Sequence, residues 1–533
     1  MRHYLSILLF ALALSLQGQN TYYVAPTGGS DSNVGTNINA PWATWQKAFE
    51  TAEAGDTVYF RGGIWSPTTF AQGNGVTGIN PRGGTGHNGE PGNRIHYFNY
   101  PGETPILDCI NLTAPSSEHS VNSYIVGIQM YDTHWIHFRG LTIRNVLQKR
   151  RFVSARGILG WPFSNMIFEN MHVHNIGGEG IYSEVDVGYT IDPETSEQWI
   201  YGWDETGYVP YDTTLFLNCD FHHCGDTLET NEGNIGDPGN MGDGFKVING
   251  GGHVTFDGCR AWGCSDDGFD MPGYGVTRFY NCWSFANGVD LITGAIIDQY
   301  EGNGFKFGAN SNILSYPVKI LKNCIAAYNR ETGFFVLEYS GYDRTRARIY
   351  NVTSYRNGNN ITISYNEGWA DSENIFRNVI TYGARRNDAG GRPYEVDAQT
   401  VYTISNSTFY YTMYGSLARW DWNSNYPISD NDFIETSFAQ CMSQMTAPRK
   451  SDHSLPDITF LKLKETSPLK GAGMQIPIED NSGTTLTFEG SAPDIGYMNY
   501  APIIEPPVPT YGDKVGTLNG KLVISNGKII IVK

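Results

Sequence analysis

Phe256-Asp257-Gly258-Cys259 and Tyr280-Asn281-Cys282 are two copies of a short phrase that recurs through the middle of the chain. The further copies are Phe168-Glu-Asn170-Met, Leu217-Asn218-Cys, Leu321-Lys-Asn323-Cys, Tyr350-Asn351-Val, Arg377-Asn378-Val and Ser405-Asn406-Ser. The shortest interval, from Gly258 to Asn281, is 23 residues, several others are 27 or 28, and the longest is 48. Most copies precede an alternating strand pattern and a turn that contains glycine or asparagine. A repeat of this length, made of short strands, predicts an all-β fold whose coils stack as a parallel β-helix.

The recurring asparagine and the cysteines are expected to be structural. An inward asparagine at a bend can bond backbone groups that the turn leaves unpaired, and its amide can stack on the amide of the next coil. The eight cysteines include no Cys-x-x-Cys pair, so the ligand spacing of a zinc site is absent. They are expected to pack as small apolar groups. Disulfides between neighbouring coils stay open as an alternative, because stacked strands lie only ~4.8 Å apart.

The two ends of the chain differ from this middle. Residues 1–19 contain an apolar run, Leu5 to Leu16, and are predicted to be a signal peptide, since the run is too short to cross a bilayer. A secreted chain without a membrane span is therefore expected. Residues 20–500 are predicted to form the β-helix domain, and helical spacing at Trp45, Ala48, Phe49 and Ala52 predicts a capping helix at its start. Residues 501–510 are a Pro-rich linker, and 511–533 a small β-like tail that is a candidate sorting segment.

Three related phrases bring carboxylates and lysines into one frame: Gly242-Asp243-Gly-Phe-Lys246, Ser265-Asp266-Asp267-Gly-Phe-Asp270 and Gly302-Asn303-Gly-Phe-Lys306. The shared Gly-Phe predicts one register on stacked coils, with phenylalanine in the core. Four carboxylates at matching positions repel one another unless a cation lies between them, and Ca²⁺ accepts such oxygen ligands. The alternative is a structural calcium ion that only holds neighbouring coils together. Lys306 in the same frame favours catalysis, whereas Lys246 either binds substrate or lies on the surface.

These motifs resemble those of polysaccharide lyase family 9, which includes pectate lyases and rhamnogalacturonan lyases. The resemblance rests on GDGFK, DDGFD, NCWSFANG and GNGFKFG, and runs from YYVAPTGGSDSN near the start to the stretch 447–496. It implies a right-handed parallel β-helix and a calcium-dependent β-elimination on an acidic pectic polysaccharide. It also implies site roles: calcium ligands at Asp243, Asp266, Asp267 and Asp270, and the Brønsted base at Lys306. At 330–339 the chain has Arg-Glu-Thr-Gly-Phe-Phe-Val-Leu-Glu-Tyr, where pectate-active relatives usually carry a Gly-Phe-Asp-Gln-Asn-Asn-like run.

The expected elimination removes the C5 proton of a uronate, and lysine, with a pKa of ~10.4, is a poor base while it is charged. A calcium ion beside it would acidify the substrate and disfavour the ammonium form, so an alkaline optimum and complete loss of activity on chelation are expected. Four arginines are candidate partners for further carboxylates: Arg330, Arg344, Arg346 and Arg356. For each one alone, a solvated surface position is the more common role. His172/His174 and His222/His223 are expected to be structural.

The net charge of −18 argues against nucleic acid or an anionic membrane as a partner. A polyanionic substrate then requires local cations, which a bound metal supplies. The chain is expected to act as a monomer. Two other functions stay open: a β-helical glycoside hydrolase that uses Asp243 with Asp266 or Asp267 as acid and base, and a non-catalytic carbohydrate-binding solenoid. No Gly-His-Gly and Arg-Ile-Lys pair follows downstream to support the hydrolase.

Overall fold

The computed structural model describes the chain from residue 19 onward in segments. These are 19–68, 77–113, 124–150, 153–185, 189–191, 198–200, 213–228, 238–249, 253–273, 276–309, 318–338, 346–363, 374–386, 395–398, 402–408, 412–413, 426–476, 488, 490–498, 524–525 and 528–529. The predicted signal peptide, except Gln19, and the predicted linker lie outside these residues. No helix in these segments is long and apolar enough to span a membrane.

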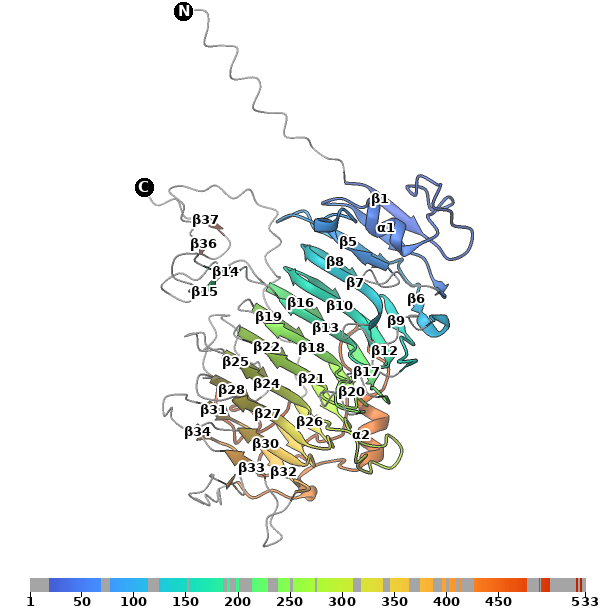
Figure 1. Ribbon diagram of the computed structural model, residues 1–533. Coiled ribbons are helices and arrows are strands. Elements are labelled where there is room, and N and C mark those ends of the chain that lie inside the picture. Colours follow the sequence, from blue (N-terminus) through green and yellow to red (C-terminus); the bar gives the residue numbers. More distant parts are fainter. Residues whose placement is uncertain are drawn as a thin grey trace, which may run out of the picture.

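Three stacks of parallel strands form the body of the molecule (Figure 1). Sheet I contains β1 (Thr21–Val24), β2 (Thr57–Phe60), β5 (Ile95–Asn99), β8 (Ile136–Arg139), β11 (Ile167–Glu169), β16 (Thr213–Leu217), β19 (His253–Asp257), β22 (Val276–Tyr280), β25 (Val318–Lys322), β28 (Arg346–Tyr350), β31 (Asn374–Arg377) and β34 (Tyr402–Ser405). Sheet II contains β3 (Gly63–Trp65), β6 (Pro105–Asp108), β9 (Thr142–Arg144), β12 (His172–Ile176), β17 (Asp220–Cys224), β20 (Arg260–Trp262), β23 (Trp283–Phe285), β26 (Ile325–Ala327), β29 (Thr353–Tyr355) and β32 (Ile380–Tyr382).

Sheet III carries the candidate site. It contains β4 (Thr77–Ile79), β7 (Tyr124–His134), β10 (Ser154–Ser164), β13 (Ile181–Val185), β18 (Phe245–Asn249), β21 (Phe269–Pro272), β24 (Phe305–Ala309), β27 (Thr332–Glu338), β30 (Asn359–Ile363), β33 (Val396–Ala398) and β35 (Thr412–Met413). The chain passes from sheet I to II to III and then begins the next coil, as in β16, β17, β18 and β19. The predicted parallel β-helix is confirmed.

Four further strands form two small antiparallel sheets, β14 (Tyr189–Ile191) with β15 (Gln198–Ile200) and β36 (Ile524–Ser525) with β37 (Lys528–Ile529). The predicted capping helix is α1 (Trp45–Thr51), in which Thr44 accepts a hydrogen bond from the Lys47 backbone N–H at 3.1 Å. The helix lies at the N-terminal end of the stack (Figure 1), and its side chains Trp45, Ala48 and Phe49 are buried. Among the described residues there are also short 3₁₀ helices at η1 (Pro81–Gly83), η2 (Cys109–Asn111) and η4 (Asp430–Asp432).

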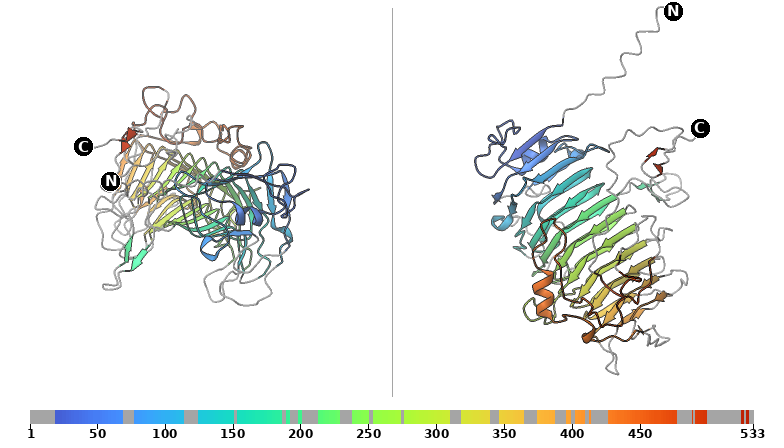
Figure 2. Two further views of the ribbon diagram at one scale, coloured as in Figure 1. Left: turned by 90° about the horizontal axis from the view of Figure 1, so that it is seen from above. Right: turned by 180° about the vertical axis from the view of Figure 1, so that it is seen from behind.

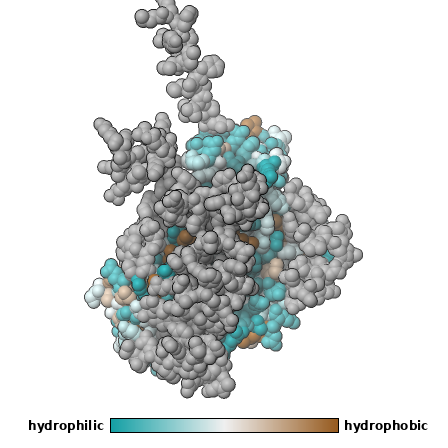
Figure 3. All heavy atoms as spheres, turned by 60° about the vertical axis from the view of Figure 1, so that its left-hand side comes forward, coloured by the Kyte–Doolittle hydropathy of each residue, from teal (hydrophilic) through white to brown (hydrophobic). Residues whose placement is uncertain are grey.

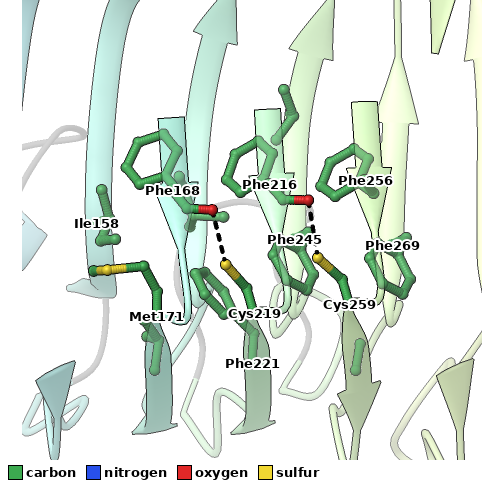
Figure 4. Close-up of a cluster of buried hydrophobic side chains, with 14 of the residues drawn as sticks. Ile158, Phe168, Met171, Phe216, Cys219, Phe221, Phe245, Phe256, Cys259 and Phe269 are labelled. Atoms are coloured by element: carbon green, nitrogen blue, oxygen red, sulfur yellow. Dashed lines mark hydrogen bonds between the residues drawn. The ribbon is translucent and has the colours of Figure 1, made fainter. Parts of the chain in front are cut away.

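Columns of phenylalanine rings align the coils. Phe168, Phe216, Phe256 and Phe279 stack in sheet I with ring centroids 4.7 to 4.9 Å apart. The sheet III column meets them edge to face, as where Phe245 contacts Phe256 (Figure 4). Each buried ring contributes roughly 1.5–3 kcal/mol. A slip of one residue would turn every ring in a strand outward, so these columns fix the register. The described surface in Figure 3 is mostly hydrophilic, with small separate hydrophobic areas.

The recurring asparagine or glycine lies at the turn from sheet I to sheet II. In all eight copies of the phrase this residue has a positive φ, from 45° at Asn406 to 63° at Gly258. Glycine and asparagine adopt this left-handed conformation at the lowest cost, which explains the repeated residue type. The expected amide stacking is also present, since Asn323 Nδ2 donates to Asn281 Oδ1 at 2.9 Å. The repeated asparagine is thus selected for its backbone conformation as well as for its amide.

A second amide ladder lies inside the turn from sheet II to sheet III. Asn287 donates to Asn329 at 2.8 Å, and Asn329 donates to Asn357 at 2.9 Å. All three side chains are fully buried. The eight cysteines are free and buried. Four of them donate to a backbone carbonyl oxygen of the preceding coil. Figure 4 shows Cys219 and Cys259 donating to the carbonyl oxygens of Phe168 and Phe216 at 3.2 and 3.3 Å.

The C-terminal segment, residues 426–476 and 490–498, packs along sheet II (Figure 2). Its helix α2 (Phe438–Met445) lies beside β17 and β20 in Figure 1. Arg260 of β20 donates to the Met445 carbonyl at 2.8 Å, and Arg449 pairs with Asp220 of β17 at 2.6 Å. Farther along the stack, the Met498 backbone N–H donates to Asn323 at 2.8 Å. The C-terminal segment therefore bridges coils that are far apart in sequence.

Candidate active site

The Gly-Phe phrases bring the predicted residues to the start of three adjacent strands of sheet III. Phe245, Phe269 and Phe305 stack in one inward column, with centroids 4.7 and 4.8 Å apart. The glycine before each phenylalanine is required by close packing: a Cβ at Gly268 would lie 2.0 Å from the Ser284 hydroxyl oxygen. The backbone N–H of Gly244 donates to the Asp267 carbonyl, and that of Gly268 donates to the Asn303 carbonyl. Asp243, Asp267 and Asn303 therefore form one column on successive coils. The predicted common register is present.

Three carboxylates converge at this point. Asp243, Asp266 and Asp267 each offer an oxygen within 4.8 Å of the others, and all three side chains are buried. Asp267 accepts from the Asn303 amide at 2.8 Å, while its own backbone N–H donates to Asp243 at 2.9 Å. Oδ1 of Asp266 is buried without a hydrogen-bond partner. The group is thus held in place by hydrogen bonds, and one of its buried carboxylate oxygens has no hydrogen-bond partner among the described residues.

Asp270 and both lysines form a second row, one step further along the strands. Asp270 pairs in register with Lys246 of β18 on one side and with Lys306 of β24 on the other. Lys246 Nζ lies 2.7 Å from Asp270 and 3.1 Å from Asp243, and Lys306 Nζ lies 2.8 Å from Asp267. Asp270 is not part of the group of three, since its carboxylate faces Lys246. The structure brings all five residues of the predicted centre together and adds Lys246.

The close, buried charges shift the pKa values of the aspartates and of Lys306. Burial raises the pKa of Asp243 to about 8, with further increases from Asp270 and Asp267 that Lys246 partly offsets. Burial and the charge of Asp267 hold the pKa of Asp266 well above its usual range. For Lys306, burial lowers the pKa, but Asp267, Asp270, Asp266 and Asp243 together raise it above the ordinary value. Buried, crowded carboxylates of this kind fit a divalent cation with hard oxygen ligands, such as Ca²⁺.

Of the four arginines predicted to bind substrate, two pair with carboxylates outside the aspartate cluster, and the side chains of the other two are not described. Arg330, before β27, pairs with Glu331 at 3.1 Å and donates to the Tyr300 and Glu301 carbonyl oxygens. Arg356 pairs with Asp430 of the C-terminal segment at 2.7 Å. Arg344 lies in the undescribed stretch 339–345, and Arg346 begins β28 with a side chain that is not described. Their assignment to substrate binding stays a prediction.

Three residues near the site were not singled out from the sequence. Asn303 occupies the aspartate position of the third phrase, so that phrase already contained the signal. Glu179 extends the same column to the preceding coil, where its carboxylate is fully buried and 3.2 Å from Arg156. The stretch Gly178-Glu179-Gly180-Ile181 repeats the pattern of Gly242 to Phe245 with glutamate for aspartate. Tyr182 pairs in register with Lys246.

The histidine pairs lie on sheet II, on strands β12 and β17, away from the carboxylate cluster on sheet III. Nε2 of His172 is 2.8 Å from Nε2 of His222, and the His222 ring stacks on Trp262 at 4.0 Å. Burial lowers the pKa of His174 to about 4, helped by the neighbouring His172. Burial also lowers the pKa values of His172, His222 and His223. These four imidazoles are neutral in the folded protein at neutral pH.

The free energy of unfolding should therefore fall as the pH drops from about 6.5 to about 4. The unfolded chain binds protons on these histidines near pH 6.5, whereas folded His174 binds one only near pH 4, so stability is complete above pH 6.5 and is lost as the pH falls. We expect about 1–3 kcal/mol less loss between pH 7 and 4.5 in a His174→Gln variant than in the wild type, measured by urea unfolding. An unchanged pH dependence in that variant would contradict the assignment.

Comparison with known proteins agrees with this geometry. Residues 22–374 match the family model described as the Pel9A-like, right-handed β-helix region. The chain belongs to this family. Pectate lyase L of Dickeya chrysanthemi is 26% identical over 495 residues, covering 91% of this chain and 92% of that protein. Pectate lyase PEL9 of Emericella nidulans is 25% identical over 334 residues, covering 58% and 68%.

Two solved structures share the fold of this Pel9A-like chain. The crystal structure of pectate lyase Pel9A aligns with a TM-score of 0.58 at 22% identity, covering 90% of this chain and 96% of that one. A structure of a rhamnogalacturonan lyase aligns with a TM-score of 0.60 at 22% identity, covering 84% and 97%. The resemblance to family 9 and the right-handed helix expected from it are confirmed. Membership of this family makes the chain a polysaccharide lyase, as the motifs predicted.

Proposed function

We propose that this protein cleaves an acidic pectic polysaccharide, a polygalacturonate or a rhamnogalacturonan backbone, by calcium-dependent β-elimination outside the cytoplasm. The observation that carries the proposal is the contact of Lys306 Nζ with Asp267, 2.8 Å away, at the edge of three buried carboxylates in a Pel9A-like β-helix. A lysine so placed can reach a proton on a sugar whose carboxylate is held at the same cluster. The names of the relatives support the substrate class.

Asp243, Asp266 and Asp267 are the proposed ligands of calcium, with Asp270 as a fourth. The buried, unpartnered Oδ1 of Asp266 and the raised pKa values of Asp243 and Asp266 support this assignment. When bound, calcium would stabilise the negative charge that develops on the uronate carboxylate. Asn303 keeps Asp267 oriented through its amide. The positive charge of Lys246, on the strand before Asp270, pairs with the carboxylates of Asp243 and Asp270.

Lys306 is the proposed base and takes the C5 proton at Nζ. The aspartates around Lys306 raise its pKa and so keep it protonated. It can act as a base only when a cation balances the negative charge of these aspartates. Elimination across C4 and C5 leaves an unsaturated sugar end that absorbs ultraviolet light. Release of such ends from either polymer by the purified protein tests the proposal. Release of saturated ends alone would favour a hydrolase, and no cleavage would favour a binding solenoid.

An aromatic platform lies on the N-terminal side of the site and is expected to bind the polysaccharide. Trp161 of β10 is 45% exposed, and its ring lies nearly parallel to that of Tyr182, with centroids 6.1 Å apart. The Arg156 guanidinium lies over Tyr182 at 4.2 Å. Tyr182 is one strand from Lys246. Such rings stack on the C–H faces of sugars.

Replacing Trp161 with alanine should raise KM roughly 3- to 10-fold and change kcat little, because a stacking contact contributes about 0.5–1.5 kcal/mol and Trp161 is remote from the base. Initial rates of ultraviolet absorbance over a range of polymer concentrations measure both constants. Ile434→Ala, at a residue 42% exposed in the C-terminal segment, is the control and should leave both unchanged. A fall in kcat with KM unaltered would argue against a binding platform.

A further inference from the structure

A buried aspartate, Asp226, lies on the coil before the Asp266–Asp267 phrase, in the turn that follows β17. The Ser265 backbone N–H donates to the carbonyl oxygen of Cys224 at 2.8 Å, which continues the parallel pairing of β17 with β20. Asp226 therefore occupies the same position of its turn as Asp266 does one coil later. Its side chain is fully buried, yet it is not a member of the group of three carboxylates.

One oxygen of Asp226 contacts both segments that lead into the cluster. Oδ1 accepts a hydrogen bond from the Met241 backbone N–H at 3.1 Å and another from the Ser265 hydroxyl at 3.2 Å. Met241 lies two residues before Asp243, and Ser265 lies directly before Asp266. Oδ2 is buried and has no hydrogen-bond partner among the described residues, so both of these contacts use the same atom.

The two segments also contact each other, with no room for a side chain between them. The Asp266 backbone N–H donates to the Gly242 carbonyl at 3.3 Å. A Cβ at Gly242 would lie 2.2 Å from the Ser265 hydroxyl oxygen and 2.5 Å from Cα of Gly225. Together with the two hydrogen bonds to Asp226, these contacts form a closed ring. A shift of one segment relative to the other would break at least one of them.

We propose that Asp226 is a positioning residue for calcium, which sets the separation of Asp243 and Asp266 before the ion binds. This inference rests on the proposed function, in which both aspartates are calcium ligands. Their like charges repel each other until a cation lies between them, and the ring of hydrogen bonds opposes that repulsion. Ligands that are already held in place lose less conformational entropy when the ion binds. Loss of a residue that orients metal ligands typically lowers metal affinity about 10- to 100-fold.

Calorimetric titration with calcium, in the absence of polysaccharide, tests this role. Asp226→Ala removes the shared acceptor and should weaken calcium binding about 10- to 100-fold. Ser265→Ala removes one of the two donors and should weaken binding by a smaller factor. Asp226→Asn keeps an acceptor oxygen and should restore most of the affinity. In activity measurements, Asp226→Ala should need more calcium for half-maximal rate but approach the wild-type kcat at saturating calcium, because all the ligands remain.

Asp56→Ala is the matched control, since Asp56 is a buried aspartate that contacts two segments at the N-terminal end of the stack. Its carboxylate accepts from the backbone N–H groups of Asn20 and Glu53 at 2.8 and 2.9 Å. Loss of these contacts should lower the melting temperature and leave calcium affinity unchanged.

The inference is overturned by a folded Asp226→Ala variant, checked by circular dichroism, that binds calcium as tightly as the wild type. It is also overturned if Asp56→Ala loses as much affinity, or if Asp226→Asn binds as weakly as Asp226→Ala. Should Asp226→Ala fail to fold, unchanged calcium affinity in Ser265→Ala has the same meaning. Failure of the proposed function has a different signature, since the wild type itself would then bind no calcium or release no unsaturated ends.

Discussion

Replacing Lys306 with alanine is expected to lower turnover at least about 1,000-fold, within the range that positioned general bases contribute. The variant should stay folded, since the substitution removes the ion pair with Asp267 but leaves the neighbouring core phenylalanines untouched. It should also still bind calcium, because all four aspartates remain. Unsaturated-end formation measures the loss, and calorimetric titration with calcium checks the site.

Lys246→Ala is the matched control, because the structure places two lysines symmetrically about Asp270. Lys246 contacts Asp243 and Asp270, so its removal alters charge balance and substrate binding. We expect kcat within about tenfold of the wild type and a higher KM. If Lys246→Ala is inactive while Lys306→Ala turns over normally, the two roles are exchanged.

Removing one carboxylate from the cluster is expected to abolish both calcium binding and activity. Asp267→Asn keeps the shape of the side chain and its contact with Asn303 but removes a buried negative charge at the centre of the group. We expect calcium affinity to fall at least about 100-fold, as hard cations depend on ligand charge. Calcium should raise the melting temperature of the wild type and leave that of the variant unchanged.

Asp457→Asn serves as the control for that experiment, since this aspartate is exposed and, among the described residues, its ion pair is with Lys450 at 2.6 Å. It should respond to calcium as the wild type does. Excess chelator should stop the wild-type reaction, and calcium should restore it. Full activity in chelator, or an equal calcium-induced shift in Asp267→Asn and the wild type, would reject the calcium assignment.

The sequence was sufficient to predict the coils and the meeting of the site residues because both depend on local periodicity. The Gly-Phe pairs place Asp243, Asp267 and Lys306 by register alone, and each asparagine phrase ends a strand of sheet I. The side-chain pairing within the site was not predictable in this way. That Lys246 turns toward Asp270 and Asp243 depends on rotamers, which no repeat encodes.

Contacts between distant parts of the chain also could not be predicted from the sequence. Arg449 meets Asp220 across 229 residues, and Arg356 meets Asp430 in a segment that has no repeat. Nothing in the local pattern distinguishes such an arginine from one that binds a substrate carboxylate. The histidines were expected to be structural, but the contact of His222 with Trp262 on the next strand could not be predicted without the register of sheet II.

The C-terminal segment that bridges sheet II changes how the molecule should come apart. A stack of coils in which each unit touches only its neighbours frays from its ends in steps. Here the Arg449–Asp220 and Met498–Asn323 contacts tie the C-terminal segment to the coil of β17 and β18, which carries Lys246, and to the coil of β25 and β26, which follows β24. The cluster thus lies inside a closed loop of contacts, and its coils should lose structure together in one cooperative transition. The C-terminal segment closes this loop of contacts, so a chain cut short before residue 426 would lack it.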